Sequence, residues 1–281
     1  MPDIEAHEQN RKSWNVATAR HNLHKGDQAA FFRAGGNTLY REETKLLGDI
    51  RGASLVHLQC NCGQDTLSIA RHLGASVTGV DISDEAINFA RELSAGSGIP
   101  ATFHRSDIFT WCENPDAPKF DIAFVSYGTV NWLGDLARWA QGVANILHPG
   151  GRLVFIDYHP AIMMFSESTD AWELEYDYLG GQLISDGEGV GDYVGEASGQ
   201  QPAELPPFEN PHYANAYPWG VAETIMPLVS AGLTIEHFEE YPYSNGWKVN
   251  SALVQRDGRR FYMPDGRPNI AMMFSCVARK R

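Results

Sequence analysis

Between residues 54 and 158 the sequence alternates short apolar runs with amphipathic segments, and this alternation limits the fold more than any other feature. The apolar runs predict strands over 54–59, 76–80, 100–104, 120–126 and 152–158. Helical periodicity lies between them, over 65–73, from Ser83 onward and over 133–147, with Ser83 as the expected N-cap. Strands separated by helices predict βαβ units, and therefore a parallel sheet that helices cover on both faces.

The chain outside this core follows other patterns. Residues 160–215 are rich in Gly, acidic residues, Tyr and Pro without a clear period, which is typical of a functional insertion or lid. A helix is expected over 219–231, and strands over 233–241 and 269–278 are expected to form a final antiparallel pair. Residues 1–50 are expected to be mostly helical and to lie outside the sheet.

The charge of the 281-residue chain is −13, and it is unevenly distributed. Residues 153–247 contain no Lys or Arg and 16 acidic residues, whereas the remainder holds 22 basic and 19 acidic residues. A chain this acidic repels phosphate backbones, so a nucleic-acid partner is not expected. The acidic stretch has two interpretations: a solvated surface, or a site that disfavours anionic substrates.

Other compositional signals concern location and metals. The sequence has neither 18 consecutive apolar residues nor a signal-peptide pattern at its N-terminus, so no membrane span and a cytoplasmic location are expected. The four cysteines are then expected to be reduced thiols. Cys60 and Cys62 lack a second Cys/His pair at zinc spacing, so we expect them to pack in the core, and no metal site is predicted.

In an open α/β sheet, ligands bind beyond the carboxyl ends of the strands. The loop 57–66 follows the first predicted strand and leads into a helix N-terminus, where backbone N–H groups can receive an anion. Asp81 follows the second strand, 18 residues after Gly63, at a distance typical of a carboxylate that binds ribose hydroxyls. Polar residues also follow the third, fourth and fifth strands, at 106–108, 126–128 and 157–159.

This order of motifs resembles that of class I S-adenosylmethionine-dependent methyltransferases. The resemblance rests on the strand–loop–helix–strand–Asp pattern, followed by Ser-Asp-Ile, Phe-Asp-Ile-Ala-Phe-Val and His-Pro-Gly-Gly-Arg-Leu, and covers about residues 50–160. It implies a Rossmann-like, mostly parallel seven-stranded sheet whose last strand is antiparallel. It also implies four regions: 1–50, an N-terminal helical lid; 51–159, a cofactor-binding core; 160–215, an insertion that caps the substrate; and 216–281, the C-terminal part of the core sheet.

The same resemblance implies that S-adenosyl-L-methionine is the cofactor and suggests which residues hold it. The Gly63 loop would touch its methionine part, Asp81 its ribose, Asp107 and Ile108 its adenine, while Ser126 would line the cleft floor. The full set of expected cofactor-binding residues is Trp14, Tyr40, Gln59, Asn61, Gly63, Thr66, Asp81, Ile82, Ser106, Asp107, Ile108 and Ser126.

The loop departs from the family's usual Asp-x-Gly-x-Gly-x-Gly pattern. Its positions hold His57, Gln59, Asn61 and Gly63, so only the last glycine remains, and Gln59 and Asn61 are expected to supply amide contacts instead. A dinucleotide-dependent dehydrogenase is the alternative that shares a strand, a loop and an acid. Such a dehydrogenase requires Gly-x-Gly-x-x-Gly so that the backbone of the loop can approach a pyrophosphate, and this pattern is absent from the loop.

The candidate catalytic residues are Tyr127, after the fourth strand, and His159, after the fifth; a structural role is the alternative for each. Trp14, His21 and Tyr40 are expected to fold over the cofactor. The acceptor site is expected in residues 1–40, 160–215 and 242–268. The aromatic residues there predict either an apolar pocket or a helical mini-core: Phe165, Trp172, Tyr176, Tyr178, Tyr193, Phe208, Tyr213, Tyr217 and Trp219.

The predicted function is methyl transfer to an O, N or C nucleophile of a small molecule by in-line displacement. Because the sulfonium is already activated, alignment contributes more than acid–base catalysis. The expected substrate is neutral or cationic, with neither nucleic acid nor membrane as partner, and the protein is expected to be a monomer or homodimer. The alternative is a non-catalytic module that uses the fold only to bind the cofactor.

Overall fold

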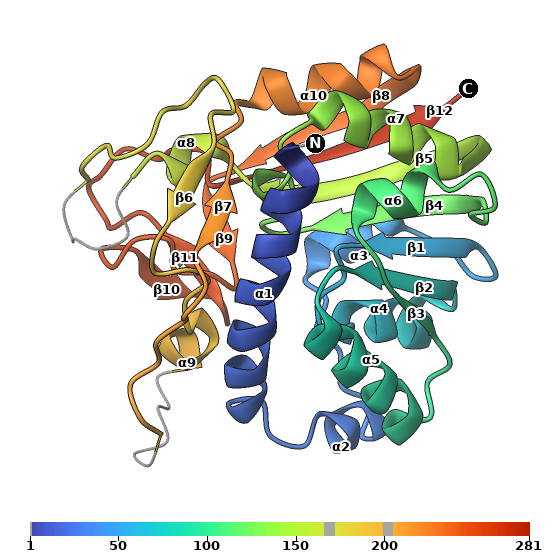
Figure 1. The fold of residues 1–281 in the computed structure, drawn as a ribbon, viewed down its shortest axis with the longest axis horizontal. Helices are drawn as coiled ribbons and strands as arrows, with labels where there is room; N and C mark the ends of the chain where they lie inside the picture. Colours follow the sequence, from blue (N-terminus) through green and yellow to red (C-terminus); the bar gives the residue numbers. More distant parts are fainter. Residues whose placement is uncertain (1, 166–171, 199–204) are drawn as a thin grey trace.

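The computed structural model describes residues 2–165, 172–198 and 205–281, and its centre is a seven-stranded sheet in the order β3-β2-β1-β4-β5-β12-β8 (Figure 1). β12 runs antiparallel to both of its neighbours, while the other pairs are parallel. The predicted Rossmann-like sheet with an antiparallel last strand is therefore confirmed. Its strands are β1 (Ser54–Leu58), β2 (Ser76–Asp81), β3 (Thr102–Arg105), β4 (Phe120–Ser126), β5 (Leu147–Tyr158), β8 (Leu233–Tyr241) and β12 (Met273–Lys280).

Helices cover both faces of this sheet because its central strands are apolar on both sides. In β5, Leu153 and Phe155 pack in one core cluster, whereas Val154 and Ile156 pack in another on the opposite face. The helices are α1 (Pro2–Leu23), α2 (Gln28–Arg33), α3 (Arg41–Leu47), α4 (Gln64–Ser68), α5 (Asp84–Ser97), α6 (Ile108–Glu113), α7 (Leu136–Ile146), α8 (Pro160–Met163), α9 (Tyr193–Ser198) and α10 (Val221–Ser230).

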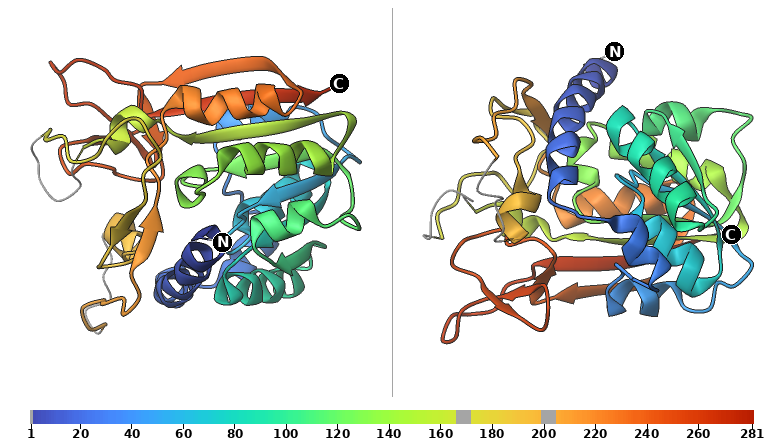
Figure 2. Two further views of the ribbon diagram at one scale, coloured as in Figure 1. Left: turned by 45° about the horizontal axis from the view of Figure 1, so that its top comes forward. Right: turned by 90° about the horizontal axis from the view of Figure 1, so that it is seen from below.

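Two small sheets and α1 lie beyond the carboxyl ends of the parallel strands. Figure 2 shows α1 crossing in front of these ends, with the small sheets at the same end of the molecule. One small sheet pairs β6 with β7, and the other has the order β10-β11-β9. Their strands are β6 (Ile184–Asp186), β7 (Ala214–Ala216), β9 (Tyr243–Asn245), β10 (Val254–Arg256) and β11 (Arg260–Tyr262).

Several predicted boundaries were wrong for local reasons. α7 begins at Leu136 rather than at 133, because Asp135 caps it by accepting a hydrogen bond from the Arg138 backbone N–H. β5 begins at Leu147, so the Pro-Gly-Gly stretch that was expected to form a turn before the strand lies within it. The pairing of β5 with β4 shifts register at this stretch.

The end of the core shows similar differences. α10 begins at Val221 rather than at 219, because the Gly220 backbone N–H is bound by the side chain of Glu223, which starts the helix there. The last strand, β12, begins at Met273, four residues later than predicted, where its pairing with β5 and β8 starts.

Candidate active site

A cleft of about 1830 Å³ lies at the carboxyl ends of the parallel strands, between the core, α1 and the small sheets. It is the place where the sheet topology predicts ligand binding. The cleft brings together most of the residues predicted from the sequence, although they come from segments far apart in the chain. The predicted residues that line it are Trp14, Tyr40, Gln59, Asn61, Asp81, Ile82, Ser106, Asp107, Ile108, Ser126 and Tyr127.

In the loop after β1, two residues other than glycine adopt backbone conformations that are typical of glycine. Gln59 and Asn61 have φ values of 54° and 47°, in the left-handed region that non-glycine residues rarely adopt. Asn61 is suited to this conformation because its Oδ1 accepts a hydrogen bond from the Cys62 backbone N–H at 2.7 Å. The side chain of Gln59 donates to the Thr129 carbonyl at 2.9 Å, while its own buried Oε1 has no partner within the described chain.

Gly63 and Thr66 are not among the residues that line the cleft. Gly63 has a φ of 74°, and a Cβ there would lie 2.8 Å from the Phe103 ring and 2.9 Å from the Ala90 Cβ. Close packing against β3 and α5 therefore explains this glycine. The hydroxyl of Thr66 lies 2.8 Å from Nδ1 of His57, so its visible role is to hold that ring.

His57 stands where the family has an acid, and it is buried at the cleft wall. Its Nε2 lies 3.3 Å from the Ser126 hydroxyl. Burial lowers the pKa of His57 to about 3, so the ring is neutral near neutral pH. The position therefore carries no charge to pair with a cofactor, unlike the usual acid.

Asp81 ends β2, and its carboxylate orders the loop after β1. Oδ2 accepts a hydrogen bond from the Asn61 backbone N–H at 2.8 Å, and Oδ1 accepts one from the Ser83 backbone N–H at 2.9 Å. Burial raises the pKa of Asp81, while these backbone hydrogen bonds act in the opposite direction. A carboxylate has lone pairs beyond these bonds, so Asp81 can also accept from a ligand in the cleft.

His7 on α1 contacts Asp107, a residue 100 positions away, and sequence reasoning missed it. Its Nδ1 lies 2.6 Å from Oδ2 of Asp107, and its side chain is 5% exposed at the cleft wall. Burial acts to raise the pKa of Asp107, but hydrogen bonds from His7 and the Thr110 N–H outweigh it and lower that pKa. The N-terminal helix thus reaches the part of the cleft where adenine was expected.

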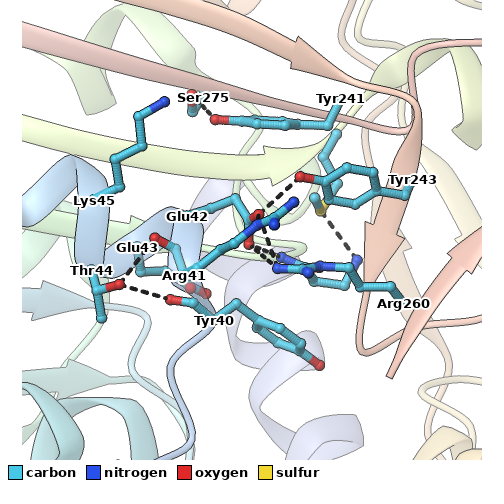
Figure 3. A network of polar contacts seen from close by, with 12 residues as sticks. Tyr40, Arg41, Glu42, Glu43, Thr44, Lys45, Tyr241, Tyr243, Arg260 and Ser275 are labelled. Atoms are coloured by element: carbon cyan, nitrogen blue, oxygen red, sulfur yellow. Dashed lines mark hydrogen bonds and ion pairs between the residues drawn. The ribbon is translucent and has the colours of Figure 1, made fainter. Parts of the chain in front are cut away.

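A buried polar network connects α3 to the small sheet of β9 to β11 (Figure 3). Glu42 forms an ion pair with Arg260 at 2.8 Å and accepts hydrogen bonds from the Tyr243 hydroxyl and the Asn245 amide. Burial acts to raise the pKa of Glu42, but hydrogen bonds from Arg41 and these partners lower it to about 2. Glu42 is therefore a buried, ionised anchor for the wall of the cleft.

Glu43 has the opposite environment. The Tyr127 hydroxyl donates to its Oε1 at 2.5 Å, and its Oε2 is buried without a hydrogen-bond partner among the described residues. Burial, with a smaller contribution from the charge of Asp65, raises the pKa of Glu43 to about 8. Tyr127 has a φ of 48°, a conformation that functional sites often preserve, and Asn245 donates to its hydroxyl at 3.1 Å.

His159 is not among the lining residues. Its ring caps α8 by accepting a hydrogen bond from the Ala161 backbone N–H, and its Nε2 lies 2.9 Å from a carboxylate oxygen of Glu240. Burial lowers the pKa of His159. These contacts give the ring a structural role and place it away from the cleft surface.

The region after β5 supplies aromatic and acidic side chains to the cleft, as the pocket interpretation predicts. One pair, Phe165 and Trp172, instead packs ring to ring at 5.3 Å against a separate apolar cluster. Tyr213 is 47% exposed and is not a lining residue. The aromatic and acidic lining residues from this region are Tyr176, Asp177, Tyr178, Asp186, Glu188, Asp192, Tyr193, Phe208, Glu209, Tyr217 and Trp219.

Asp192 attaches this region to α1. Its carboxylate pairs with Arg20 at 2.7 Å and with His24 at 2.9 Å, and His21 lies 2.9 Å from the Gly191 carbonyl. His21 therefore stabilises the cover of the cleft but does not line it, unlike Trp14 and Tyr40.

Two further searches cover the described part of the chain. It contains no group of three His, Cys, Asp or Glu side chains arranged to hold a metal ion. Across the same residues, the structure has no helix with the length and apolar character needed to cross a bilayer.

Known proteins resemble this chain in sequence and in fold. The family description "Methyltransferase domain" matches residues 56–151. A demethylmenaquinone methyltransferase from Lactococcus lactis is 25% identical over 149 residues, which cover 48% of this chain and 54% of that protein. An O-methyltransferase, cnsE, from Penicillium expansum is 32% identical over 127 residues, which cover 43% of this chain and 44% of that protein.

The chain thus spans about half the length of these curated relatives. The crystal structure of a Listeria monocytogenes protein described as an S-adenosylmethionine-dependent methyltransferase has the same fold, with a TM-score of 0.57 and 16% identity. The alignment covers 85% of this chain and 96% of that one. Residues 56–151 therefore match a methyltransferase domain, and the chain shares the fold of a structure described as an S-adenosylmethionine-dependent methyltransferase.

Proposed function

We propose that this protein binds S-adenosyl-L-methionine in the cleft and transfers its methyl group to a small molecule. The observation that carries the proposal is the position of Asp81 and the left-handed loop around Asn61. Both line the cleft within the matched methyltransferase domain, where the fold places its ligand.

The residues present fit this cofactor. Asp81 would accept hydrogen bonds from the two ribose hydroxyls. Gln59 would receive the methionine ammonium, because its buried Oε1 has no partner within the described chain and an ammonium offers donors only. A neutral His57 cannot balance that charge, so the amide oxygen of Gln59 would replace the acid that the family usually has at position 57.

The cofactor supplies an activated methyl group bound to a sulfonium. The protein would then hold the acceptor in line and exclude water, a contribution that can reach roughly 7–11 kcal/mol. Trp14, which lines the cleft from α1, and the region after β5 would provide this cover. Tyr127 is the better placed of the two proposed catalytic residues, because it lines the cleft whereas His159 does not.

We propose that the acceptor is neutral or cationic. Among the described residues that line the cleft, the Lys and Arg side chains are those of Lys25 and Arg259. The region after β5 alone contributes five acidic side chains to the same lining. The aromatic rings of that region offer apolar contact and faces that attract cations. Phosphorylated acceptors would meet repulsion there.

The activity test is a transfer assay with S-adenosylmethionine labelled in its methyl group and a panel of small amines, phenols and thiols. The account expects label in at least one neutral or cationic acceptor and loss of that transfer in Asp81→Asn. Binding of the cofactor with no transfer across the panel would favour the non-catalytic module instead.

A further inference from the structure

We propose that His7 recognises the adenine base, by accepting a hydrogen bond from its exocyclic amino group at Nε2. This inference rests on the proposed function, since it needs an adenosyl cofactor in the cleft. It assigns a specificity role to the N-terminal helix, outside the matched domain of residues 56–151.

His7 lies on the face of α1 that borders the cleft. His7, Asn10 and Trp14 are spaced by three and four residues, so they share one face of the helix, and all three line the cleft. The helix is fixed at two points that follow His7. Asn10 exchanges hydrogen bonds with the backbone of Asn215, and Asn15 donates to the carboxylate of Asp84 at 3.0 Å.

The contact with Asp107 determines which nitrogen of His7 carries the hydrogen. The lowered pKa of Asp107 keeps its carboxylate ionised near neutral pH, and an ionised carboxylate only accepts hydrogen bonds. Nδ1 of His7 must therefore be the donor in the 2.6 Å contact. In the neutral ring, Nε2 then carries a lone pair and acts as an acceptor.

This acceptor is buried and has no hydrogen-bond partner among the described residues. A buried polar atom without a partner costs stability, so it marks a place where a ligand atom can bind. Because Nε2 has almost no exposed surface, the ring of His7 must rotate for Nε2 to reach a ligand in the cleft. Ile108, expected beside the adenine, and Ser106, another expected cofactor-binding residue, line the same cleft.

Asp107 holds the ring of His7 and caps α6. Its Oδ1 already accepts a hydrogen bond from the Thr110 backbone N–H at 2.9 Å, and its Oδ2 accepts the bond from His7. The carboxylate therefore orients the ring, and the ring presents an acceptor. The exocyclic amino group of adenine is a donor, whereas hypoxanthine has an acceptor oxygen at the same position.

The test compares binding of S-adenosylhomocysteine and S-inosylhomocysteine by calorimetry at about pH 8. The wild-type protein should prefer the adenosyl ligand by about tenfold or more, since one buried hydrogen bond would be replaced by two facing acceptors. His7→Phe should lose most of this preference, mainly through weaker binding of the adenosyl ligand. His148→Phe, the same change at an exposed histidine that does not line the cleft, should retain it.

Other outcomes overturn the proposal. An unchanged preference in folded His7→Phe, or a parallel loss for both ligands, would mean that His7 only docks α1. If His7→Phe does not fold, the ¹⁵N resonance of Nε2 in the wild-type protein decides. It should shift with the adenosyl ligand and not with S-inosylhomocysteine, and equal shifts contradict the inference. A wild-type protein that binds neither ligand would instead refute the proposed function.

Discussion

Oδ2 of Asp81 accepts a hydrogen bond from the backbone N–H of Asn61 at 2.8 Å, and this contact joins the end of β2 to the loop after β1. One carboxylate therefore serves two purposes in the proposed site. It fixes a loop whose backbone is left-handed at Asn61, and it lines the cleft where ribose hydroxyls would bind. Its removal should thus affect both stability and ligand binding.

The first prediction concerns that carboxylate. Asp81→Ala should weaken binding of S-adenosylhomocysteine by about 1–3 kcal/mol, because the ribose hydroxyls lose their charged acceptor. Calorimetry measures the change. Asp116→Ala, which removes the same charge from an exposed residue that does not line the cleft, should bind normally. Unchanged affinity in a folded Asp81→Ala protein would show that Asp81 does not hold the ribose.

The second prediction concerns the loop backbone. Asn61→Val should be less stable than Asn61→Gly by about 1–2 kcal/mol, because a β-branched residue is strained at a φ of 47°. Both variants lose the Asn61 side-chain hydrogen bond, so their difference isolates the backbone. Urea unfolding provides the comparison, and equal free energies of unfolding would contradict the assigned conformation.

Sequence patterns predicted the core because its signals are local. β1, β4 and β5 contain apolar runs of their own, and Asp81 ends β2, so the ligand-binding edge could be located without long-range information. The insertion over residues 160–215, inferred because that stretch lacks a period, stays a prediction.

The walls of the cleft could not be predicted in the same way. Glu42 and Glu43 look like surface residues of a short polar helix, yet both are buried. Residues of β9 and β11 bind Glu42, and Tyr127 binds Glu43. His7 meets Asp107 across 100 residues, and one histidine among ten carries no signal for such a contact. Tertiary contacts, rather than local patterns, determine these positions.

The third prediction tests the ion pair beneath the cleft wall. Arg260→Met should destabilise the protein by about 3–5 kcal/mol, because it leaves the buried carboxylate of Glu42 without its cation. Adding Glu42→Gln removes that charge and should restore part of the loss. Chemical denaturation of the two single variants and the double variant measures the coupling. Additive losses would mean that the two residues do not interact.

The fourth prediction follows from the raised pKa of Glu43, about 8 in the folded protein against 4.5 for an ordinary Glu. The folded state then binds the proton more tightly than the unfolded state, so this group stabilises the fold at low pH. That contribution to stability decreases as the pH rises from about 4.5 to about 8. Glu43→Gln should therefore become more stable relative to wild type between about pH 5 and 8. A stability difference that does not change with pH would contradict the raised pKa.

The fifth prediction concerns the charge of the acceptor. In protein saturated with S-adenosylhomocysteine, phenylethylamine should bind more tightly than phenyl phosphate, because the cap presents carboxylates and aromatic faces to the cleft. Competition calorimetry at moderate ionic strength makes the comparison. Tighter binding of the phosphate, without added metal, would refute a preference for neutral or cationic acceptors.

The central claim is that the cleft beside Asp81 binds an S-adenosyl cofactor, and one calorimetric experiment tests it most directly. S-adenosylmethionine, S-adenosylhomocysteine and NAD are titrated separately into the purified protein. The account predicts saturable binding of the first two at one site per chain, weakened by Asp81→Asn, and no binding of NAD. Binding of NAD with no binding of either S-adenosyl compound would contradict it.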